Sequence, residues 1–339
     1  MPQVLIWLKF LACLAIIFFA GTKLVRYGDA IAEKTGLGRI WIGLVLLAII
    51  TSVPELITSV SAVALVGLPD LALGTLFGSC LFNLTILALL DILHRHTPVL
   101  SQARRRHIAS AGIGVLLIAI AGGNIYVGGK LDGLSLGWVS IPTIIILVLY
   151  LVSMWRIYRF ERGYPGQRLE GASPRYAAIP ARTVYLRFTL AAIAVVGAGI
   201  WLSFVGDEIA AAYPWSASFV GSLFLAITTS MPELIVAIAA FRLGAIDMAV
   251  ADILGANMLD VAHLFIVDFF YAQGPILSVV SGVHLTTAVL VAVMNMLVII
   301  GILFRCKSKT FGVISWYGLA LIGLYIFGAY ALFKGVGLG

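Results

Sequence analysis

Long apolar runs alternate with short polar segments along the whole sequence. The runs are close to the roughly 20 residues that an α-helix needs to cross the hydrocarbon core of a bilayer, which is about 30 Å thick. This pattern favours an all-α membrane protein. We predict ten transmembrane helices, at residues 4–22, 40–66, 70–90, 108–121, 134–154, 185–205, 216–240, 247–271, 282–303 and 311–333.

Composition agrees with this pattern, because 62% of the 339 residues are hydrophobic and only 11% are charged. Such values exclude a soluble enzyme. Cys13, Cys80 and Cys306 are far apart in sequence, so we expect packing roles for them rather than disulfides or a metal cluster. The first run follows a start without a basic segment or a cleavage site, and we interpret it as a span rather than a removed signal.

The formal net charge of +7 is explained by how the basic residues are distributed. Of the 22 Lys and Arg residues, 18 lie in loops that follow odd-numbered runs, and a nineteenth, Arg187, lies beside such a loop at the start of the sixth run. Loops rich in Lys and Arg stay on the cytoplasmic side of a membrane, so we predict that these loops are cytoplasmic. With an even number of spans, both termini are then outside. The basic charge therefore reports topology, and no nucleic-acid partner is expected.

The most unusual feature is an acidic, proline-containing stretch inside an apolar run, and it occurs twice. Residues 51–56 read TSVPEL, and residues 229–234 read TSMPEL. A carboxylate inside a membrane span is costly, which indicates a functional role. The two stretches belong to a longer internal repeat that aligns residues 21–91 with residues 199–268, at an offset of 178 and then 177.

Each copy of the repeat lies in a half of the chain that contains five spans. Because five is odd, the second half must enter the membrane in the opposite orientation, which makes this an inverted repeat. We predict a first repeat over 1–155 with its alpha-1 motif at 48–91, a basic cytoplasmic linker over 156–184, and a second repeat over 185–339 with its alpha-2 motif at 226–268. In transporters built in this way, the binding site lies near the midplane on broken helices.

Spans 2 and 7 are predicted to be broken at proline. Pro54 and Pro232 lack the amide hydrogen that would bond the carbonyl oxygen four residues earlier, and this loosens the preceding turn. Backbone oxygens near Ala48–Thr51 and Ala226–Thr229 thereby become candidate ligands.

Side-chain oxygens are concentrated around both breaks, and oxygen is the ligand atom that Na⁺ and Ca²⁺ require. Four-residue spacing adds one polar stripe on each following span. The candidates are Thr51, Ser52, Glu55, Thr229, Ser230 and Glu233 at the breaks, and Thr75, Ser79 and Asn83 in span 3; in span 8, Asp252, Ala256 and Asp260 occupy the positions that match the span-3 stripe. With Glu55, Glu233 and Asp260 ionised, the site carries three negative charges that cations or protons must neutralise. Competition between one Ca²⁺ and several Na⁺ for this cluster favours an antiporter.

These motifs resemble the two alpha repeats of the cation/calcium exchanger superfamily, particularly its sodium/calcium exchangers. The resemblance rests on TSVPEL followed by GSCLFN at 78–83, and on TSMPEL followed by GANMLD at 255–260, and it covers nearly the whole chain. It implies ten helices in two inverted halves, an ion site on helices 2, 3, 7 and 8, and a first and a sixth helix that slide as a gate.

The resemblance also implies individual ligands. Glu55 and Glu233 would bind calcium, aided by the carbonyl oxygens of Thr51 and Thr229. The sodium sites would be completed by side chains from both repeats and two backbone carbonyls: Ser52, Ser79, Asn83, Ser230 and Asp260, with the carbonyl oxygens of Ala48 and Ala226.

Two positions depart from the family pattern. Ala256 replaces a serine, which removes a hydroxyl from a sodium site, and Asp252 one turn earlier could compensate. Cys80 replaces an asparagine, which we expect to affect helix packing. Because clustered carboxylates also bind protons, exchange of Ca²⁺ or another divalent cation for H⁺ is kept as an alternative.

Other functional classes are less favoured. The inverted repeat with a single midplane site speaks against a cation channel, and the sequence contains no paired Asp-Asp motif, HExxH or phosphate-binding Gly loop that would indicate an enzyme. No cofactor is expected, and the partners are small inorganic cations and the lipid bilayer. The short linker leaves little room for a regulatory domain, which favours a prokaryotic plasma membrane, and a monomer is compatible with the sequence.

The remaining polar residues receive structural interpretations. We expect solvated or helix-capping roles for Asp70, Asp91, Asp247 and Asp268 at span ends. His263 could pair with Asp260, although a packed neutral histidine is favoured. Solvated positions are predicted for His94, His96 and His107 in the basic loop after span 3.

Overall fold

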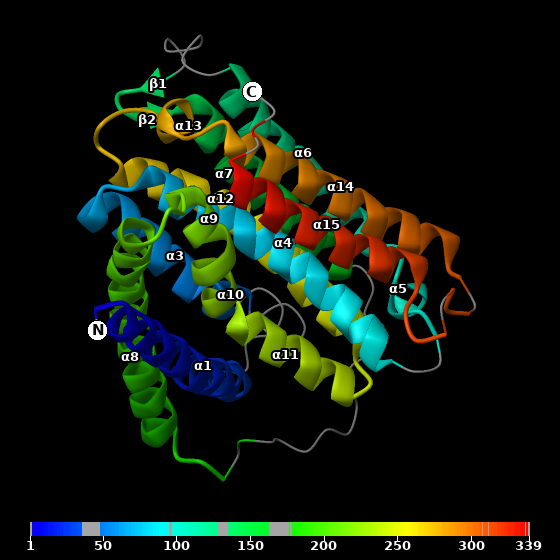
Figure 1. Cartoon of the computed structure of the whole chain (residues 1–339). Helices are drawn as coiled ribbons and strands as arrows, with labels where there is room; N and C mark the ends of the chain where they lie inside the picture. Colours follow the sequence, from blue (N-terminus) through cyan, green and yellow to red (C-terminus); the bar gives the residue numbers. More distant parts are fainter. Residues whose placement is uncertain are drawn as a thin grey trace.

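The computed structural model describes residues 2–35, 48–94, 97–127, 135–162, 176, 178–306, 308–310, 312–335 and 337. Helices dominate these residues, and one short antiparallel hairpin pairs β1 (Ser135–Leu136) with β2 (Val139–Ser140). The helices, shown in Figure 1, are α1 (Pro2–Thr35), α3 (Val53–Ser61), α4 (Pro69–Leu93), α5 (Val99–Gln102), α6 (His107–Val127), α7 (Ile141–Arg162), α8 (Ala181–Ala212), α9 (Ala217–Val220), α10 (Ala226–Thr229), α11 (Met231–Arg242), α12 (Ile246–Phe270), α13 (Ile276–Val279), α14 (Val283–Phe304) and α15 (Trp316–Lys334), with π-helical turns η1 (Ala62–Val66) and η3 (Gly221–Leu225).

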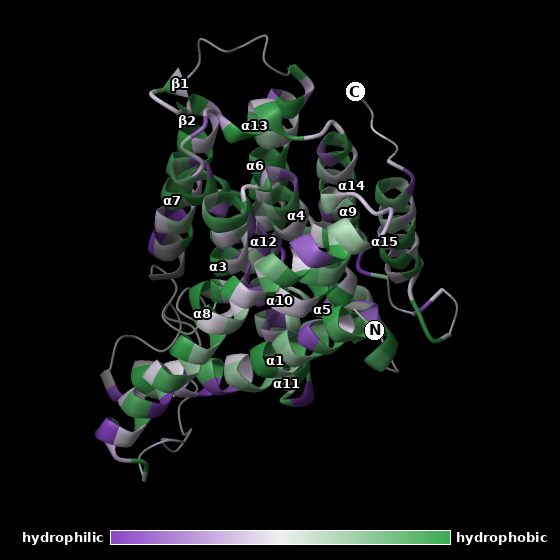
Figure 2. Ribbon diagram, turned by 60° about the vertical axis from the view of Figure 1, so that its left-hand side comes forward, coloured by the Kyte–Doolittle hydropathy of each residue, from purple (hydrophilic) through white to green (hydrophobic). Residues whose placement is uncertain are grey.

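Within the described residues, seven helices are long and apolar enough to cross a membrane: α1, α4, α6, α8, α12, α14 and α15. The bent series from α9 to α11 forms an eighth candidate span. Two shorter apolar helices, Val53–Val66 and Ile141–Ile157, coincide with predicted spans 2 and 5. Apolar ribbon covers most of the helices α6, α14 and α15 in Figure 2. The all-helical membrane fold is confirmed, and the count of ten spans stays a prediction because residues 40–47 lie outside the described part.

The first helix continues well beyond its predicted end at residue 22. The apolar run stops at Lys23, but a periodic pattern continues, in which Leu24, Tyr27 and Ala30 are buried while Lys23 and Arg26 are exposed. Spacing by three residues keeps the apolar side chains on one helix face. Tyr27 and Ala30 pack against Tyr176 and Val184, so tertiary contacts extend the helix past the apolar run.

Helices that are equivalent in the two repeats pack against each other. The most extensive interfaces join α1 to α8, α6 to α14, and α4 to α12. Lys9 of α1 donates to Glu208 of α8 at 2.7 Å, and Arg187 near the start of α8 donates to Tyr27 of α1 at 3.0 Å, so these two helices are antiparallel. An inverted repeat requires this arrangement. In Figure 1, α1 and α8 lie together at one side of the bundle, while α4 and α12 pass through its centre.

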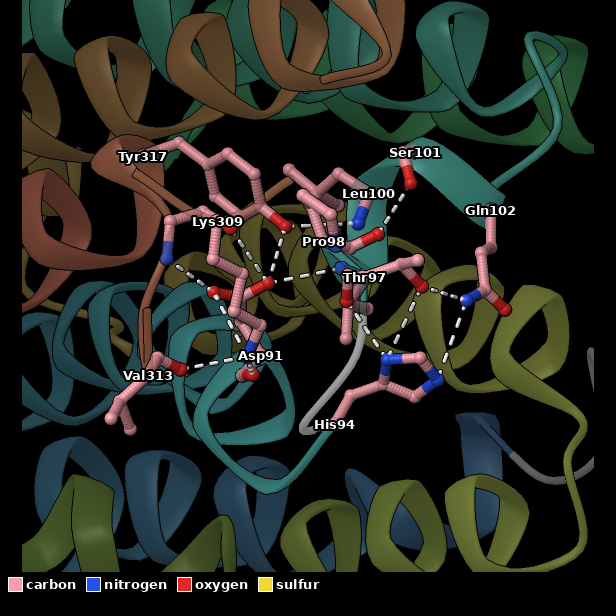
Figure 3. Close-up of polar contacts among 12 residues, drawn as sticks. Asp91, His94, Thr97, Pro98, Leu100, Ser101, Gln102, Lys309, Val313 and Tyr317 are labelled. Atoms are coloured by element: carbon pink, nitrogen blue, oxygen red, sulfur yellow. Dashed lines mark hydrogen bonds and ion pairs between the residues drawn. The ribbon is translucent and has the colours of Figure 1, made fainter. Parts of the chain in front are cut away.

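Buried carboxylates at the ends of α4 and α12 cap neighbouring helices in both repeats. Asp91 accepts hydrogen bonds from the Val99 amide at 3.0 Å, the Ser315 amide at 2.7 Å and the Tyr317 hydroxyl at 2.7 Å (Figure 3). Its repeat equivalent Asp268 accepts from the amides of Ile276 and Ser140 and from the Thr143 hydroxyl, at 2.6–2.8 Å. The capping role is confirmed for both, and neither residue is solvated.

Carboxylates at the opposite ends of α4 and α12 pair with histidines. Asp70 lies 3.0 Å from Nε2 of His284, and its equivalent Asp247 lies 2.7 Å from Nε2 of His107. The predicted solvated position of His107 is wrong, because this side chain is only 4% exposed. His94 is partly buried and hydrogen-bonds through Nδ1 to the Thr97 carbonyl at 2.8 Å, as Figure 3 shows. His96 lies outside the described residues.

Candidate functional site

The two acidic stretches form matching helix breaks. Ser52 and Ser230 leave the helical conformation, with φ/ψ angles of −86°/9° and −84°/13°. Pro54 and Pro232 follow in the first turn of α3 and α11, where a missing amide hydrogen does no harm. The chain bends by 44° between α10 and α11. The predicted break of both helices near proline is therefore confirmed.

The carbonyl oxygens of Ala48 and Ala226 lie directly before these breaks. The Ala48 oxygen accepts from the Ser52 amide and the Thr51 hydroxyl, each at 3.1 Å. The Ala226 oxygen accepts in the same way from the Ser230 amide at 3.0 Å and the Thr229 hydroxyl at 3.3 Å. Both carbonyls are thus placed identically at the end of their half-helices, and the two threonine hydroxyls point back toward the backbone.

Side-chain hydrogen bonds join the broken helix of one repeat to the broken helix of the other. The Ser52 hydroxyl donates to Glu233 Oε1 at 3.1 Å, and the Ser230 hydroxyl donates to Glu55 Oε1 at 2.8 Å. Each serine at a break therefore orients the glutamate of the other repeat. This reciprocal pairing brings both acidic stretches, 178 residues apart in sequence, into one place.

The polar stripes of α4 and α12 meet beside this centre. Asn83 Nδ2 donates to Asp260 Oδ2 at 3.4 Å. One turn earlier, Cys80 Sγ lies 3.7 Å from the Asn257 carbonyl, and Asn257 Nδ2 donates to the Cys80 carbonyl at 3.3 Å. Cys80 is fully buried in this contact, which agrees with the packing role expected for it.

Close packing holds α4 against the seventh span. A Cβ atom added at Gly78 would lie 2.4 Å from the Cα and the carbonyl oxygen of Ser222 in η3. Only glycine permits this approach. The sequence did not predict a role for Ser222, whose buried hydroxyl lies in the π-helical turn η3 before the break and has no hydrogen-bond partner among the described residues.

The predicted ligand side chains are buried and keep free oxygen atoms. The glutamates, hydroxyl residues, Asn83 and Asp260 are all 0% exposed. No hydrogen-bond partner among the described residues reaches five of their oxygens: Glu55 Oε2, Glu233 Oε2, Ser79 Oγ, Asn83 Oδ1 and Asp260 Oδ1. Buried polar atoms without partners are rare in native proteins and call for a ligand or an ion.

The charges of the centre are close enough to act on one another. Electrostatic interactions link Glu55 with Asp260, Glu233 with Glu55, and Asp260 with Glu233. In the part of the chain that the structure describes, no three His, Cys, Asp or Glu side chains converge tightly enough to hold a metal by themselves. A hard cation at this centre would therefore depend on hydroxyl, amide and carbonyl oxygens as well as on carboxylates, as Ca²⁺ and Na⁺ commonly do.

Three further residues of α12 lie near the predicted ligands. Ala256 is buried and contributes no polar atom where its repeat equivalent, Ser79, supplies a hydroxyl. His263 Nδ1 lies 3.9 Å from Asp260 Oδ1, beyond hydrogen-bond distance, so the packed histidine describes this residue better than a hydrogen-bonded pair. Asp252 is buried on α12, two turns before Asp260.

Two solved structures share this fold. Native YfkE matches 98% of this chain and 93% of its own, with a TM-score of 0.69 and 20% identity. The sodium-calcium exchanger NCX_Mj, soaked with 10 mM Na⁺ and zero Ca²⁺, matches 98% of this chain and 99% of its own, with a TM-score of 0.62 and 21% identity.

Curated relatives are membrane proteins of bacteria and archaea. The inner membrane protein YrbG of Escherichia coli (strain K12) is 28% identical over 263 residues, which cover 73% of this chain and 74% of the relative. The uncharacterized membrane protein MJ0091 of Methanocaldococcus jannaschii is 24% identical over 320 residues, 94% of each chain. The putative antiporter CaxA of Alkalimonas amylolytica is 25% identical over 282 residues, 79% of this chain and 82% of the relative.

The family model described as "Sodium/calcium exchanger protein" matches residues 5–159 and 183–334, which is most of the sequence. The matched segments contain both helix breaks and both polar stripes. The paired inverted repeats, the buried oxygen-rich centre and this match together show that the chain is a multi-pass membrane protein belonging to the sodium/calcium exchanger family of cation antiporters.

Proposed function

We propose that the protein exchanges Ca²⁺ for Na⁺ by alternating access at the centre formed by α3, α4, the α10–α11 break and α12. The observation that carries the proposal is the set of five buried, unpartnered oxygens on Glu55, Glu233, Ser79, Asn83 and Asp260. They come from both repeats, and three of them belong to carboxylates. Oxygen atoms that lack donors in an apolar interior can be satisfied by a cation.

The charge of the centre supports exchange rather than simple binding. Three ionised carboxylates in a low-dielectric interior need neutralising charge, which one Ca²⁺ or several Na⁺ supply. Glu55 and Glu233 act as the main Ca²⁺ ligands in this proposal, with the carbonyls of Thr51 and Thr229. Both kinds of cation need the same oxygens, so binding of one favours release of the other.

Na⁺ shares the two glutamates with Ca²⁺ in this proposal, and the remaining expected ligands complete the sodium positions. They are Ser52, Ser79, Asn83, Ser230 and Asp260, together with the carbonyl oxygens of Ala48 and Ala226. In the observed conformation, Ser52 and Ser230 donate to the glutamates. Bound Na⁺ would instead draw on the lone pairs of the serine oxygens, and the same hydroxyl can serve both roles because it both donates and accepts.

Access to the centre requires helix movement, because the ligand side chains are fully buried. The pair α1 and α8 is suited to this movement. It lies at one side of the bundle and contacts both breaks, with Gly21 packed on Pro232 and Gly199 packed on Ile57. We propose that this pair slides as a unit and opens the centre to each side in turn. In the plasma membrane of a prokaryote, the basic loops would be cytoplasmic and both termini outside.

Proton coupling is the second candidate, and Ala256 favours it. The missing hydroxyl weakens one sodium position, while Asp252 adds a carboxylate on the same helix. Ca²⁺ or another divalent cation would then exchange for H⁺ at the same centre.

The test is ion flux in liposomes that contain the purified protein. Replacing Glu55 or Glu233 by Gln should abolish Ca²⁺ transport, because each change removes a charge and a ligand oxygen from one ion. Glu208→Gln is the matched control, since Glu208 pairs with Lys9 at the surface of α1 and α8. Normal Ca²⁺ flux in the Glu233→Gln protein would refute the site. Flux driven by a pH gradient and indifferent to Na⁺ would replace the sodium proposal by the proton one.

A further inference from the structure

Asp252 is a buried carboxylate that makes no hydrogen bond among the described residues. Its side chain is 2% exposed, and neither Oδ1 nor Oδ2 has a hydrogen-bond partner within the described part of the chain. The buried carboxylates of Asp91 and Asp268, in contrast, each accept hydrogen bonds from two backbone amides and at least one hydroxyl. Asp252 therefore does not cap a helix as those two residues do.

The equivalent position in the first repeat shows what the fold itself needs there. Thr75 occupies that position on α4, and its hydroxyl donates to the Leu71 carbonyl at 2.9 Å. A threonine at this position therefore forms its hydrogen bond with its own helix and needs no partner from another helix. Because the two repeats have the same architecture, a carboxylate at Asp252 is not a requirement of packing.

An unpartnered carboxylate is unfavourable in a membrane protein unless a proton or a cation neutralises it. Glu233 also has a free Oε2 atom, and its helix α11 packs against α12, which carries Asp252. Two negative charges and three free carboxylate oxygens therefore lie on two helices that pack together, where they attract a cation.

The position along α12 relates Asp252 to the sodium site that Ala256 impairs. Asp252, Ala256 and Asp260 are spaced by four residues, so they lie on nearly the same helix face at intervals of about 6 Å. Ala256 lacks the hydroxyl that Ser79 provides in the other repeat. A cation that cannot use a hydroxyl at residue 256 finds a carboxylate one turn earlier.

We propose that Asp252 and the free oxygen of Glu233 form a monovalent-cation subsite, which binds Na⁺ one helical turn away from the position of the absent hydroxyl. The subsite rests on the proposed exchange function and adds a sodium position to it. Asp252 contributes to Na⁺ binding, while Ca²⁺ remains with Glu55 and Glu233.

The experiment compares the wild type with Asp252→Thr and Asp252→Asn. Threonine reproduces the residue of the first repeat, and asparagine keeps the shape of aspartate without its charge. Thr85→Ser is the matched control on α4, because Thr85 lies outside the polar stripe and its hydroxyl, which serine retains, donates to the Leu81 carbonyl at 2.8 Å. The first readout is the rise in melting temperature of the purified, Ca²⁺-free protein on titration with NaCl against choline chloride. The second is the Na⁺ concentration for half-maximal Na⁺-driven Ca²⁺ flux at fixed pH.

Both Asp252 variants should need about tenfold more Na⁺ in each readout, a loss of about 1.4 kcal/mol in binding free energy. Their apparent Ca²⁺ affinity should change much less, and Thr85→Ser should behave as the wild type. Unchanged Na⁺ titrations in folded Asp252 variants would overturn the subsite, as would a shift confined to the pH dependence of flux, which assigns a proton to Asp252. If the wild type transports no Ca²⁺, the proposed function fails; if Ca²⁺ transport persists without any effect on Na⁺, only the subsite fails.

Discussion

Gly78 lies where α4 touches the seventh span, and replacing it by alanine gives a quantitative test of the packing. The new Cβ atom would be 2.4 Å from both the Cα and the carbonyl oxygen of Ser222, whereas ordinary contacts are 3.4 Å or longer. Since both clashing atoms belong to the backbone, no side-chain rotation relieves the contact. The two segments must move apart by about 1 Å, and Ser79, the next residue, moves with α4.

The expected loss in the free energy of unfolding of Gly78→Ala is the difference between two opposing effects. Overpacking costs about 1–3 kcal/mol, and a clash with backbone belongs at the upper end of that range. Alanine is better than glycine in a helix by about 1 kcal/mol, so the net loss for Gly78→Ala is about 2 kcal/mol. Gly123 on α6 has no described atom within 4 Å of its added Cβ, so Gly123→Ala provides a control with only the favourable term.

The assay is the apparent melting temperature of the purified protein in one detergent, measured together with Na⁺-driven Ca²⁺ flux. Gly78→Ala should melt several degrees below the wild type and transport less, whereas Gly123→Ala should be equal to it or more stable. The two variants should differ by about 3 kcal/mol in stability. Equal melting temperatures and equal flux would show that α4 and η3 are not packed as described.

The remaining predictions concern the ions. Ala256→Ser should increase the apparent Na⁺ affinity of exchange by restoring a ligand hydroxyl, with Ca²⁺ affinity changed much less; a Na⁺ titration of flux at fixed pH checks this, and an unaltered titration contradicts it. Lowering the pH from about 8 to about 6 should weaken Ca²⁺ binding, because protons and Ca²⁺ compete for the same carboxylates. Ca²⁺ binding curves that coincide across that range would argue against clustered carboxylates.

The sequence by itself determined the features that depend on neighbouring residues. Apolar runs predict spans because the bilayer selects length and hydropathy. Pro54 and Pro232 predict helix breaks because a missing amide hydrogen acts within one turn. The internal repeat was visible in the alignment of residues 21–91 with 199–268, and the pairing of α1 with α8, α4 with α12 and α6 with α14 agrees with it.

Only the tertiary structure decided which polar groups satisfy one another, because their partners lie far apart in the chain. The basic sequence around His107 resembles an exposed loop, yet Asp247, 140 residues away, holds this histidine in the interior. The bonds of Ser52 to Glu233 and of Ser230 to Glu55 likewise join the repeats. A local pattern indicates that a residue is polar in an apolar span. Whether it caps a helix, as Asp91 does, or has no hydrogen-bond partner among the described residues, as for Asp252, depends on the atoms that folding brings beside it.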